Sequence, residues 1–149
     1  MKLLLVNPLL VAGDREANLA TLRDLLAPYR GRLDPTDLAL LPEHHYFGAW
    51  DDYVADMSEL AVWLGSTLVA GSTHRPLGAT RINTGAVFSA TGSVVALFEK
   101  LRPYAAERER VSPGTARGSL TLEGRRVSVM ICADFWFTDL FVSQPMPDL

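Results

Sequence analysis

The segment Arg125–Asp139, RRVSVMICADFWFTD, contains the only cysteine of the chain, and the fold can be worked out around it. Val127, Val129 and Ile131 alternate with less apolar neighbours, which is the period-2 pattern of a half-buried β-strand. The alternation stops after Cys132, so we expect the strand to deliver the thiol at its carboxyl end, where the chain turns. Ligands of α/β proteins bind at this edge of the sheet, and a sharp turn there can present a nucleophile.

A single cysteine at the end of a strand has two interpretations. Free cysteines are among the most buried residues and often pack simply as small hydrophobic groups. A nucleophilic thiol instead needs a neighbouring base and a group that stabilises developing charge. The choice therefore depends on which residues the other strands bring to Cys132.

Two other short apolar runs end in charged residues. Asp37–Glu43, DLALLPE, stops at a proline and a glutamate, and Val94–Lys100, VVALFEK, stops at a lysine. Strands that end in Glu43, Lys100 and Cys132 would supply a base, an ammonium group and a thiol, the parts of an acid/base-assisted nucleophile. Taken singly, the glutamate is more typical of a capping or surface residue, and the lysine of a solvated ion pair.

Together these stretches resemble a known family. LLPEHHYFG, FEKLRPY and VMICADFWFTDL are similar to the three motifs of the nitrilase superfamily, the carbon–nitrogen hydrolases, in that family's order of Glu, Lys and Cys. An opening strand that ends in Asn-Pro, the stretches VAGS and NTGAVFSATG, and VSPG before the cysteine strand also have counterparts there. The resemblance covers the whole chain.

The resemblance implies a function and a role for each residue. Glu43 would be the general base, Lys100 the oxyanion stabiliser and Cys132 the nucleophile that forms a covalent thioester. The expected reaction is hydrolysis of a small amide to an acid plus ammonia or an amine, without a cofactor. Nitrile hydrolysis by the same three residues and a catalytically silent binding or assembly module are the alternatives.

The family often has a further glutamate between its Lys and its Cys. Glu107 fits that place best, with Glu109 as a rival, although the run ERER is equally typical of a solvated surface. A base that works near neutral pH also needs a raised pKa, which an apolar pocket would give. Candidates for the walls of that pocket are the aromatic residues Tyr46, Phe47, Trp50, Phe135 and Trp136.

The sequence departs from the family pattern just after the cysteine. Ala133 stands where an aromatic residue is common, Asp134 keeps the acidic residue, and Trp136 or Phe137 stands about where an arginine is expected. These differences leave the substrate class open but do not touch the Glu, Lys and Cys positions.

The order of the predicted elements indicates an α/β fold with one mixed sheet. We expect a strand at 2–8 buried on both faces, a helix from a cap at Asp14 to about Tyr29, a strand at 38–41, a helix from a cap at Asp51 or Asp52 to Gly65, a strand at 66–72, hairpins of 83–89 with 94–100 and of 119–122 with 125–132, an irregular segment at 101–118, and a helix at 134–142. Strands that alternate with helices form parallel βαβ units, and the hairpins add antiparallel strands. Residues 1–149 read as a single domain.

The resemblance also implies a larger architecture. The family's fold is a four-layer αββα sandwich in a chain nearly twice this long, so we expect a C-terminal portion of the domain to be missing. A sheet face left open in this way would favour association, and we expect a homo-oligomer.

Composition excludes several other classes. The net charge is -3 and no block of Lys or Arg occurs, so the sequence predicts no nucleic-acid partner. No apolar run approaches the ~20 residues of a membrane span. A single cysteine excludes an internal disulfide framework and fits a cytoplasmic protein. His44, His45 and His74 show no metal-ligand spacing, and adjacent histidines on an extended chain point apart, so we expect surface or loop histidines and no metal site.

Overall fold

A six-stranded mixed sheet lies at the centre of the protein, in a computed structural model that describes residues 1–142 and 147–149. In spatial order its strands are β1 (Leu3–Leu5), β2 (Leu38–Leu40), β3 (Thr67–Leu77), β4 (Thr80–Phe88) and β5 (Val94–Glu99), and β6 (Val111–Ser112) pairs with one end of β4. The first three strands are parallel, whereas β3, β4 and β5 are antiparallel. The predicted mixed sheet is confirmed.

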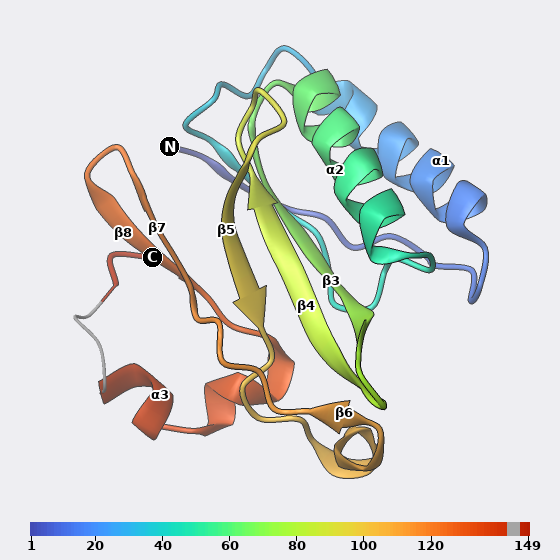
Figure 1. Ribbon diagram of the computed structural model, residues 1–149. Helices are drawn as coiled ribbons and strands as arrows, with labels where there is room; N and C mark the ends of the chain where they lie inside the picture. The colour runs from blue at the N-terminus through green and yellow to red at the C-terminus, as the bar shows by residue number, and fades with distance from the viewer. Residues whose placement is uncertain (143–146) are drawn as a thin grey trace.

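Helices α1 (Arg15–Leu26) and α2 (Trp50–Leu64) cover one face of this sheet (Figure 1). The carboxylate of Asp14 accepts a hydrogen bond from the Ala17 N–H at 2.9 Å, so the predicted cap of the first helix is confirmed. The 3-10 turn η1 (Ala27–Tyr29) follows it.

The predicted cap of α2 is wrong. The helix begins at Trp50 after Ala49, which has no capping side chain, and Asp51 and Asp52 lie inside the first turn. Their charges still favour the helix there, because the first turn carries the positive end of the helix dipole. Gly65 ends the helix with φ of 77°, the left-handed conformation that glycine adopts without strain.

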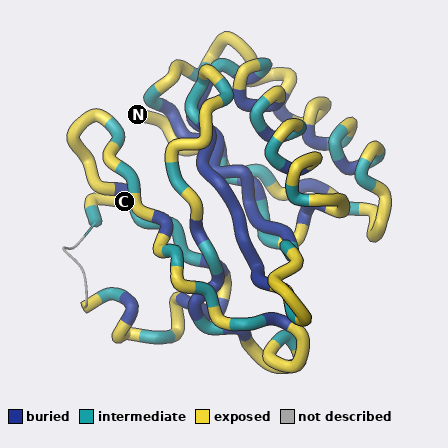
Figure 2. The backbone as a smooth tube through the Cα atoms, in the orientation of Figure 1, coloured by how far each residue is buried: buried dark blue, intermediate teal, exposed yellow. Residues whose placement is uncertain are grey.

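The hairpin of β7 (Gly118–Leu122) and β8 (Arg125–Val129) packs on the opposite face of the sheet. Successive residues of β2 separate the two sides, because Leu38 joins the cluster under the hairpin and Ala39 joins the cluster under the helices. Figure 2 shows the buried strands of the large sheet between these layers. Two sheets and one helical layer of the expected sandwich are therefore present.

Three strands differ from their predicted extents. β3 continues beyond its predicted end to Leu77, and β4 begins before its predicted start, at Thr80, after a tight turn. Backbone pairing between them continues through polar and charged residues that show no apolar alternation. β1 has only three residues, and Leu3 and Leu5 are exposed because the hairpin does not extend over that edge of the sheet. The prediction of a strand buried on both faces is wrong.

The segments around the cysteine are also less regular than predicted. β8 ends at Val129 rather than at Cys132, which instead begins the 3-10 turn η3 (Cys132–Trp136). The predicted helix over 134–142 is this turn followed by a short α3 (Asp139–Val142). The predicted irregular stretch before β7 contains a second 3-10 turn, η2 (Ala105–Glu109), and β6. None of the helices in the described residues is long and apolar enough to cross a lipid bilayer.

Candidate active site

Glu43 lies where the chain leaves β2 and runs beside the middle of β3. It pairs with Ser72 across an isolated parallel bridge, and the N–H of His44 donates to the Ser72 carbonyl at 3.0 Å. Gly71 makes this close approach possible, since a Cβ on that residue would lie 2.1 Å from the Pro42 carbonyl oxygen. The backbone thus holds the glutamate against the sheet.

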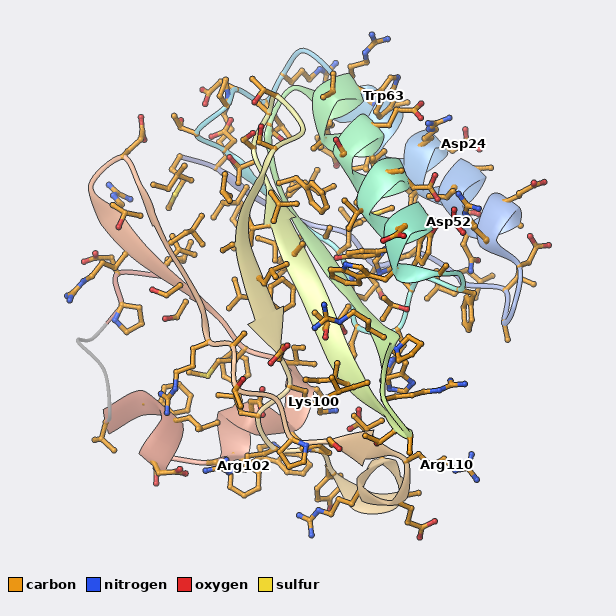
Figure 3. All side chains as sticks on the ribbon, viewed as in Figure 1. Asp24, Asp52, Trp63, Lys100, Arg102 and Arg110 are labelled. Carbon is orange, nitrogen blue, oxygen red and sulfur yellow. The ribbon has the colours of Figure 1, made fainter. Side chains whose placement is uncertain are left out.

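Lys100 is the first residue after β5, and Figure 3 shows it where that strand ends. Its side chain is only 4% exposed. The Nζ atom lies 2.8 Å from Glu43 Oε1 and 2.6 Å from Glu107 Oε2, so one ammonium group joins two carboxylates. The structure therefore brings Glu43 and Lys100 into contact and adds Glu107, whereas Glu109 is exposed.

Asn83, fully buried in β4, completes this cluster by contacting both carboxylates. Its Nδ2 donates to Glu43 Oε1 at 2.8 Å and to Glu107 Oε1 at 3.0 Å. The amide therefore holds the two carboxylates at a fixed separation without adding charge. The sequence analysis missed Asn83, although a buried asparagine in a strand is itself a signal, because such a side chain must find polar partners.

The electrostatics of the cluster favour its charged form. Burial alone would raise the pKa of Glu43, but hydrogen bonds from His44 and Lys100 outweigh it and lower the pKa to about 2. Burial would also raise the pKa of Glu107. The hydrogen bonds with Lys100 and Asn83 outweigh this effect, so the pKa of Glu107 is lowered as well. The two carboxylates in turn raise the pKa of Lys100 above its ordinary value despite its burial. At neutral pH the site is a Glu⁻–Lys⁺–Glu⁻ cluster.

The pocket that Glu43 lines is mostly apolar, but the aromatic residues expected to form its walls do not line it. The rings of Tyr46 and Trp50 contact that of Tyr53 in the first turn of α2, while Phe135 and Trp136 are 60% and 65% exposed. The partners that set the pKa of Glu43 are polar or charged, so this pKa falls instead of rising.

Cys132 sits on a sharp turn rather than on a regular strand. Its φ is 49°, a left-handed conformation that non-glycine residues rarely adopt and that recurs at functional sites. The residue is exposed. The exposed Cys132 lies between the buried Ile131 and Ala133, and sharp strand-to-helix turns of this kind can present a nucleophile.

Asp134 ties this turn to the segment that carries Lys100. Its buried carboxylate accepts hydrogen bonds from the N–H groups of Leu101 at 3.2 Å, Arg102 at 2.8 Å and Ile131 at 3.3 Å. The residue that precedes Cys132 and the two residues that follow Lys100 therefore share one acceptor. The acidic residue noted in the sequence thus fixes the position of the cysteine turn relative to the lysine segment.

Cys132 and Glu43 line the same pocket, which has a volume of about 210 Å³. Its walls are mostly apolar and come from β2, β3, β5 and the end of β8. A small substrate placed there would meet a thiol and a carboxylate at once.

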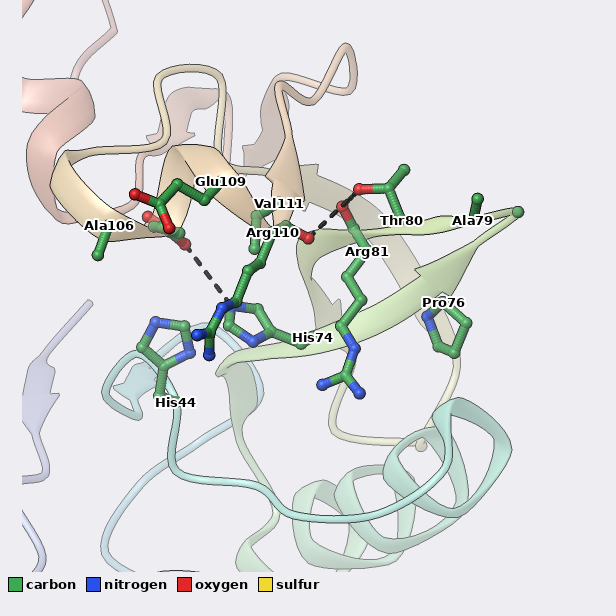
Figure 4. Close-up of a pocket in the computed structure, with 12 residues that line it drawn as sticks. His44, His74, Pro76, Ala79, Thr80, Arg81, Ala106, Glu109, Arg110 and Val111 are labelled. Atoms are coloured by element: carbon green, nitrogen blue, oxygen red, sulfur yellow. Dashed lines mark hydrogen bonds and ion pairs between the residues drawn. The ribbon is translucent and has the colours of Figure 1, made fainter.

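A larger pocket of about 1020 Å³ opens on the other side of Glu107 (Figure 4). His44 and His74 line it, with their ring centroids 4.6 Å apart, and ligand atoms of these two histidines and Glu107 all lie within 4.8 Å of one another. The sequence showed no metal-ligand spacing, yet the structure groups Glu107 with His44 and His74. The two histidines are 30 residues apart in sequence, which no spacing motif covers.

The third histidine lies in the loop between β2 and α2, as expected, but it is not on the surface. His45 is 1% exposed, and its Nδ1 lies 3.0 Å from the Pro42 carbonyl oxygen. Burial lowers its pKa to about 4, so it is neutral at pH 7. His44 and His45 have different partners, and His44 is in a left-handed turn with φ of 57° rather than on an extended chain.

Comparison with solved structures shows the same fold elsewhere. A CN-hydrolase superfamily protein from Xanthomonas campestris, solved with an arsenic adduct in its active site, superposes with a TM-score of 0.79 at 21% identity over 97% of this chain and 60% of that chain. An amidase from Nesterenkonia sp. superposes with a TM-score of 0.82 at 24% identity over 95% of this chain and 59% of that chain. The chain therefore spans about 60% of the length of the structures that it matches.

Sequence comparison identifies the family. No curated protein matched the chain. The family model described as Carbon-nitrogen hydrolase matches residues 5–144. This range includes Glu43, Lys100 and Cys132 and all of the central sheet except the first two residues of β1. This protein belongs to the carbon–nitrogen hydrolases.

Proposed function

We propose that the site hydrolyses small amides through a covalent thioester on Cys132. The observation that carries the proposal is the bridge of Lys100 Nζ to Glu43 Oε1 at 2.8 Å, with Cys132 on the wall of the pocket that also holds Glu43. A base, a fixed positive charge and an exposed thiol on a strained turn are the elements that acyl transfer requires.

In the proposed reaction the Glu43 carboxylate accepts the thiol proton as Sγ attacks the amide carbonyl carbon. The Lys100 ammonium stabilises the oxyanion of the tetrahedral intermediate. The C–N bond then breaks, the leaving amine takes the proton from Glu43, and the acyl group remains on sulfur as a thioester. Water attacks the thioester, giving its proton to Glu43, and the acid leaves as the thiol is reprotonated.

Glu107 acts in this proposal as a positioning residue. It holds Lys100 Nζ at 2.6 Å from the side opposite Glu43, which keeps the ammonium group in place. Asn83 donates a hydrogen bond to each of the two carboxylates. Because the three charged residues act as one unit, their contributions to rate should be far from additive.

The test is ammonia release from butyramide and from butyronitrile by the 149-residue chain. A solved structure of the Nesterenkonia amidase contains butyramide, which makes this amide a reasonable first substrate. We expect slow turnover of the amide by this chain alone, loss of that turnover in Cys132→Ala, and losses of roughly 100- to 10,000-fold in Glu43→Gln. The double variant Glu43→Gln/Lys100→Ala should lose far less than the product of the two single losses.

Acyl-enzyme trapping separates this function from its alternatives. Acid quench during turnover should give a mass increase of one acyl group on the chain, absent in Cys132→Ala. Faster turnover of the nitrile than of the amide would favour a nitrilase. An unmodified, unreactive cysteine in a folded chain would favour a silent module and refute the proposal.

A further inference from the structure

Two histidines and a glutamate beside the proposed active site form a donor set for a metal ion. His44 and His74 each offer an imidazole nitrogen and Glu107 offers a carboxylate oxygen, and these ligand atoms lie within 4.8 Å of one another. Two histidines with one carboxylate is a common set for Zn²⁺ in sites that keep a further position open.

The fold holds these ligands on three separate elements. His44 follows β2 in a left-handed conformation with φ of 57°, His74 lies in β3, and Glu107 lies in η2. The two imidazole rings meet edge to face, with an interplanar angle of 70°. In Figure 4 they lie next to each other, and the dashed line to His74 is its contact with Glu107.

His74 provides an independent sign that a ligand is expected here. Its Nε2 atom is buried and has no hydrogen-bond partner among the described residues. The nearest carboxylate oxygen, Glu107 Oε1, is 3.6 Å away, which is too long for a hydrogen bond. A cation between these two atoms would satisfy both.

Glu107 can accept a metal ion without releasing Lys100. The Oε2 atom contacts the lysine at 2.6 Å, whereas Oε1 faces His74 and accepts only from Asn83 at 3.0 Å. His44 would exchange its 3.3 Å contact with Glu43 for the metal. Glu43 Oε1 would keep its hydrogen bonds from Lys100 and Asn83.

The neighbouring pocket gives access and leaves a coordination position open. The same three residues line the cavity of about 1020 Å³, together with Glu109, Arg81 and Arg110. The two arginines oppose a cation, and the charges of Glu107 and Glu109 offset them. Two neutral imidazoles and a carboxylate outcompete water for a borderline cation more readily than for Mg²⁺ or Ca²⁺, which prefer oxygen ligands.

We propose that His44, His74 and Glu107 form a Zn²⁺ site adjoining the Glu43–Lys100 pair. The bound ion would share the Glu107 carboxylate with Lys100, and the contact between His44 and Glu43 would be lost. A bound transition metal would therefore change the electrostatic environment of the Lys100 ammonium group. This inference does not depend on amide hydrolysis, since it concerns binding alone.

The test is calorimetric titration of ZnCl₂ into the tag-free chain carrying Cys132→Ala, so that no thiol competes for the metal. We expect one equivalent to bind. His74→Ala should weaken binding by at least about tenfold, since loss of even an outer-shell partner of a metal ligand typically costs 10–100-fold. Glu107→Gln should weaken it as well, and the matched control Glu109→Gln, which removes the same charge from the same pocket, should not.

Cobalt absorption and thermal unfolding supply the second measurement. Co²⁺ in the site should give a visible d–d band that is lost in His74→Ala, and Zn²⁺ should raise the unfolding midpoint of the parent but not of that variant. Binding that is equal in His74→Ala and the parent, equally weakened by Glu109→Gln, or not saturable would overturn the proposal. His74→Gln replaces His74→Ala if the smaller side chain lowers the unfolding midpoint without metal.

Discussion

At the scale of single residues, one lysine and one asparagine keep two partly buried carboxylates together. Glu43 and Glu107 would repel each other at this distance, and Lys100 and Asn83 each contact both of them. The cluster has a net charge of −1, because a single positive charge faces two negative ones. A change of one charge in this cluster should therefore have a large effect.

Asn83→Asp adds a third carboxylate to the cluster in place of a hydrogen-bond donor. We expect a loss in the free energy of unfolding on the order of 3 kcal/mol at pH 7, because an uncompensated buried charge is costly. Denaturant unfolding measures it. The control Asn18→Asp changes another buried asparagine that binds only the Val11 backbone, and it should lose less. Equal losses would show that charge repulsion is not the cause.

The lowered pKa of Glu43 predicts how stability depends on pH. Its pKa falls from 4.5 to about 2 on folding, so the unfolded chain binds more protons between these values. Its stabilising contribution is therefore present above pH 4.5 and is lost as the pH falls toward 2. Glu43→Gln should be less stable than the parent at pH 7, and this difference should shrink toward pH 2. Denaturant midpoints at several pH values would contradict this if the gap stayed constant.

At the scale of elements, the catalytic groups proposed here depend on contacts between irregular segments. Neither η3 nor the stretch after β5 belongs to the ladder of the central sheet, yet they carry Cys132 and Lys100. Asp134 connects them through backbone N–H groups, which leaves the connection independent of the neighbouring side chains.

Asp134→Ala should therefore loosen the turn that presents the thiol. Three backbone donors lose their carboxylate acceptor, and we expect a loss of about 2–3 kcal/mol in the free energy of unfolding, together with reduced turnover. The matched control is Asp139→Ala, which breaks only the exposed ion pair with Arg102 at 2.7 Å. That variant should lose less than about 1 kcal/mol. A smaller effect at Asp134 than at Asp139 would remove its positioning role.

At the scale of the whole molecule, the two faces of the central sheet are covered unequally. The helices pack over one face, and the β7–β8 hairpin covers only part of the other. Leu3 and Leu5 at the β1 edge are 48% and 67% exposed. Exposed apolar side chains next to an unpaired strand edge favour association.

We accordingly expect the 149-residue chain to self-associate through this edge. Leu5→Lys should shift sedimentation toward the monomer, because burying an unpaired charge in the interface has a large desolvation cost. Val62→Lys serves as the control, since Val62 is 54% exposed on the opposite, helical side. A parent chain that sediments as a monomer at all concentrations would refute the expectation, as would equal effects of both lysines.

The sequence by itself determined the order of the main elements and the mixed sheet. It also showed that Glu43, Lys100 and Cys132 follow three strands, although Cys132 lies on a turn beyond the end of its strand. These follow from local patterns, because apolar alternation and turn residues act over a few neighbouring positions. The family resemblance pointed to Glu107 ahead of Glu109. The structure places Glu107 on Lys100, and its role in catalysis stays a proposal.

Only the tertiary structure decided the surroundings of those residues. Asn83 between the two carboxylates, the lowered pKa of Glu43 and the meeting of His44 with His74 each join segments far apart in sequence. The aromatic residues near Glu43 in sequence predicted an apolar pocket, yet the groups that set its pKa come from other elements as well as from its neighbour His44. A pKa depends on distances in space, and these are fixed only when the sheet brings the strand ends together.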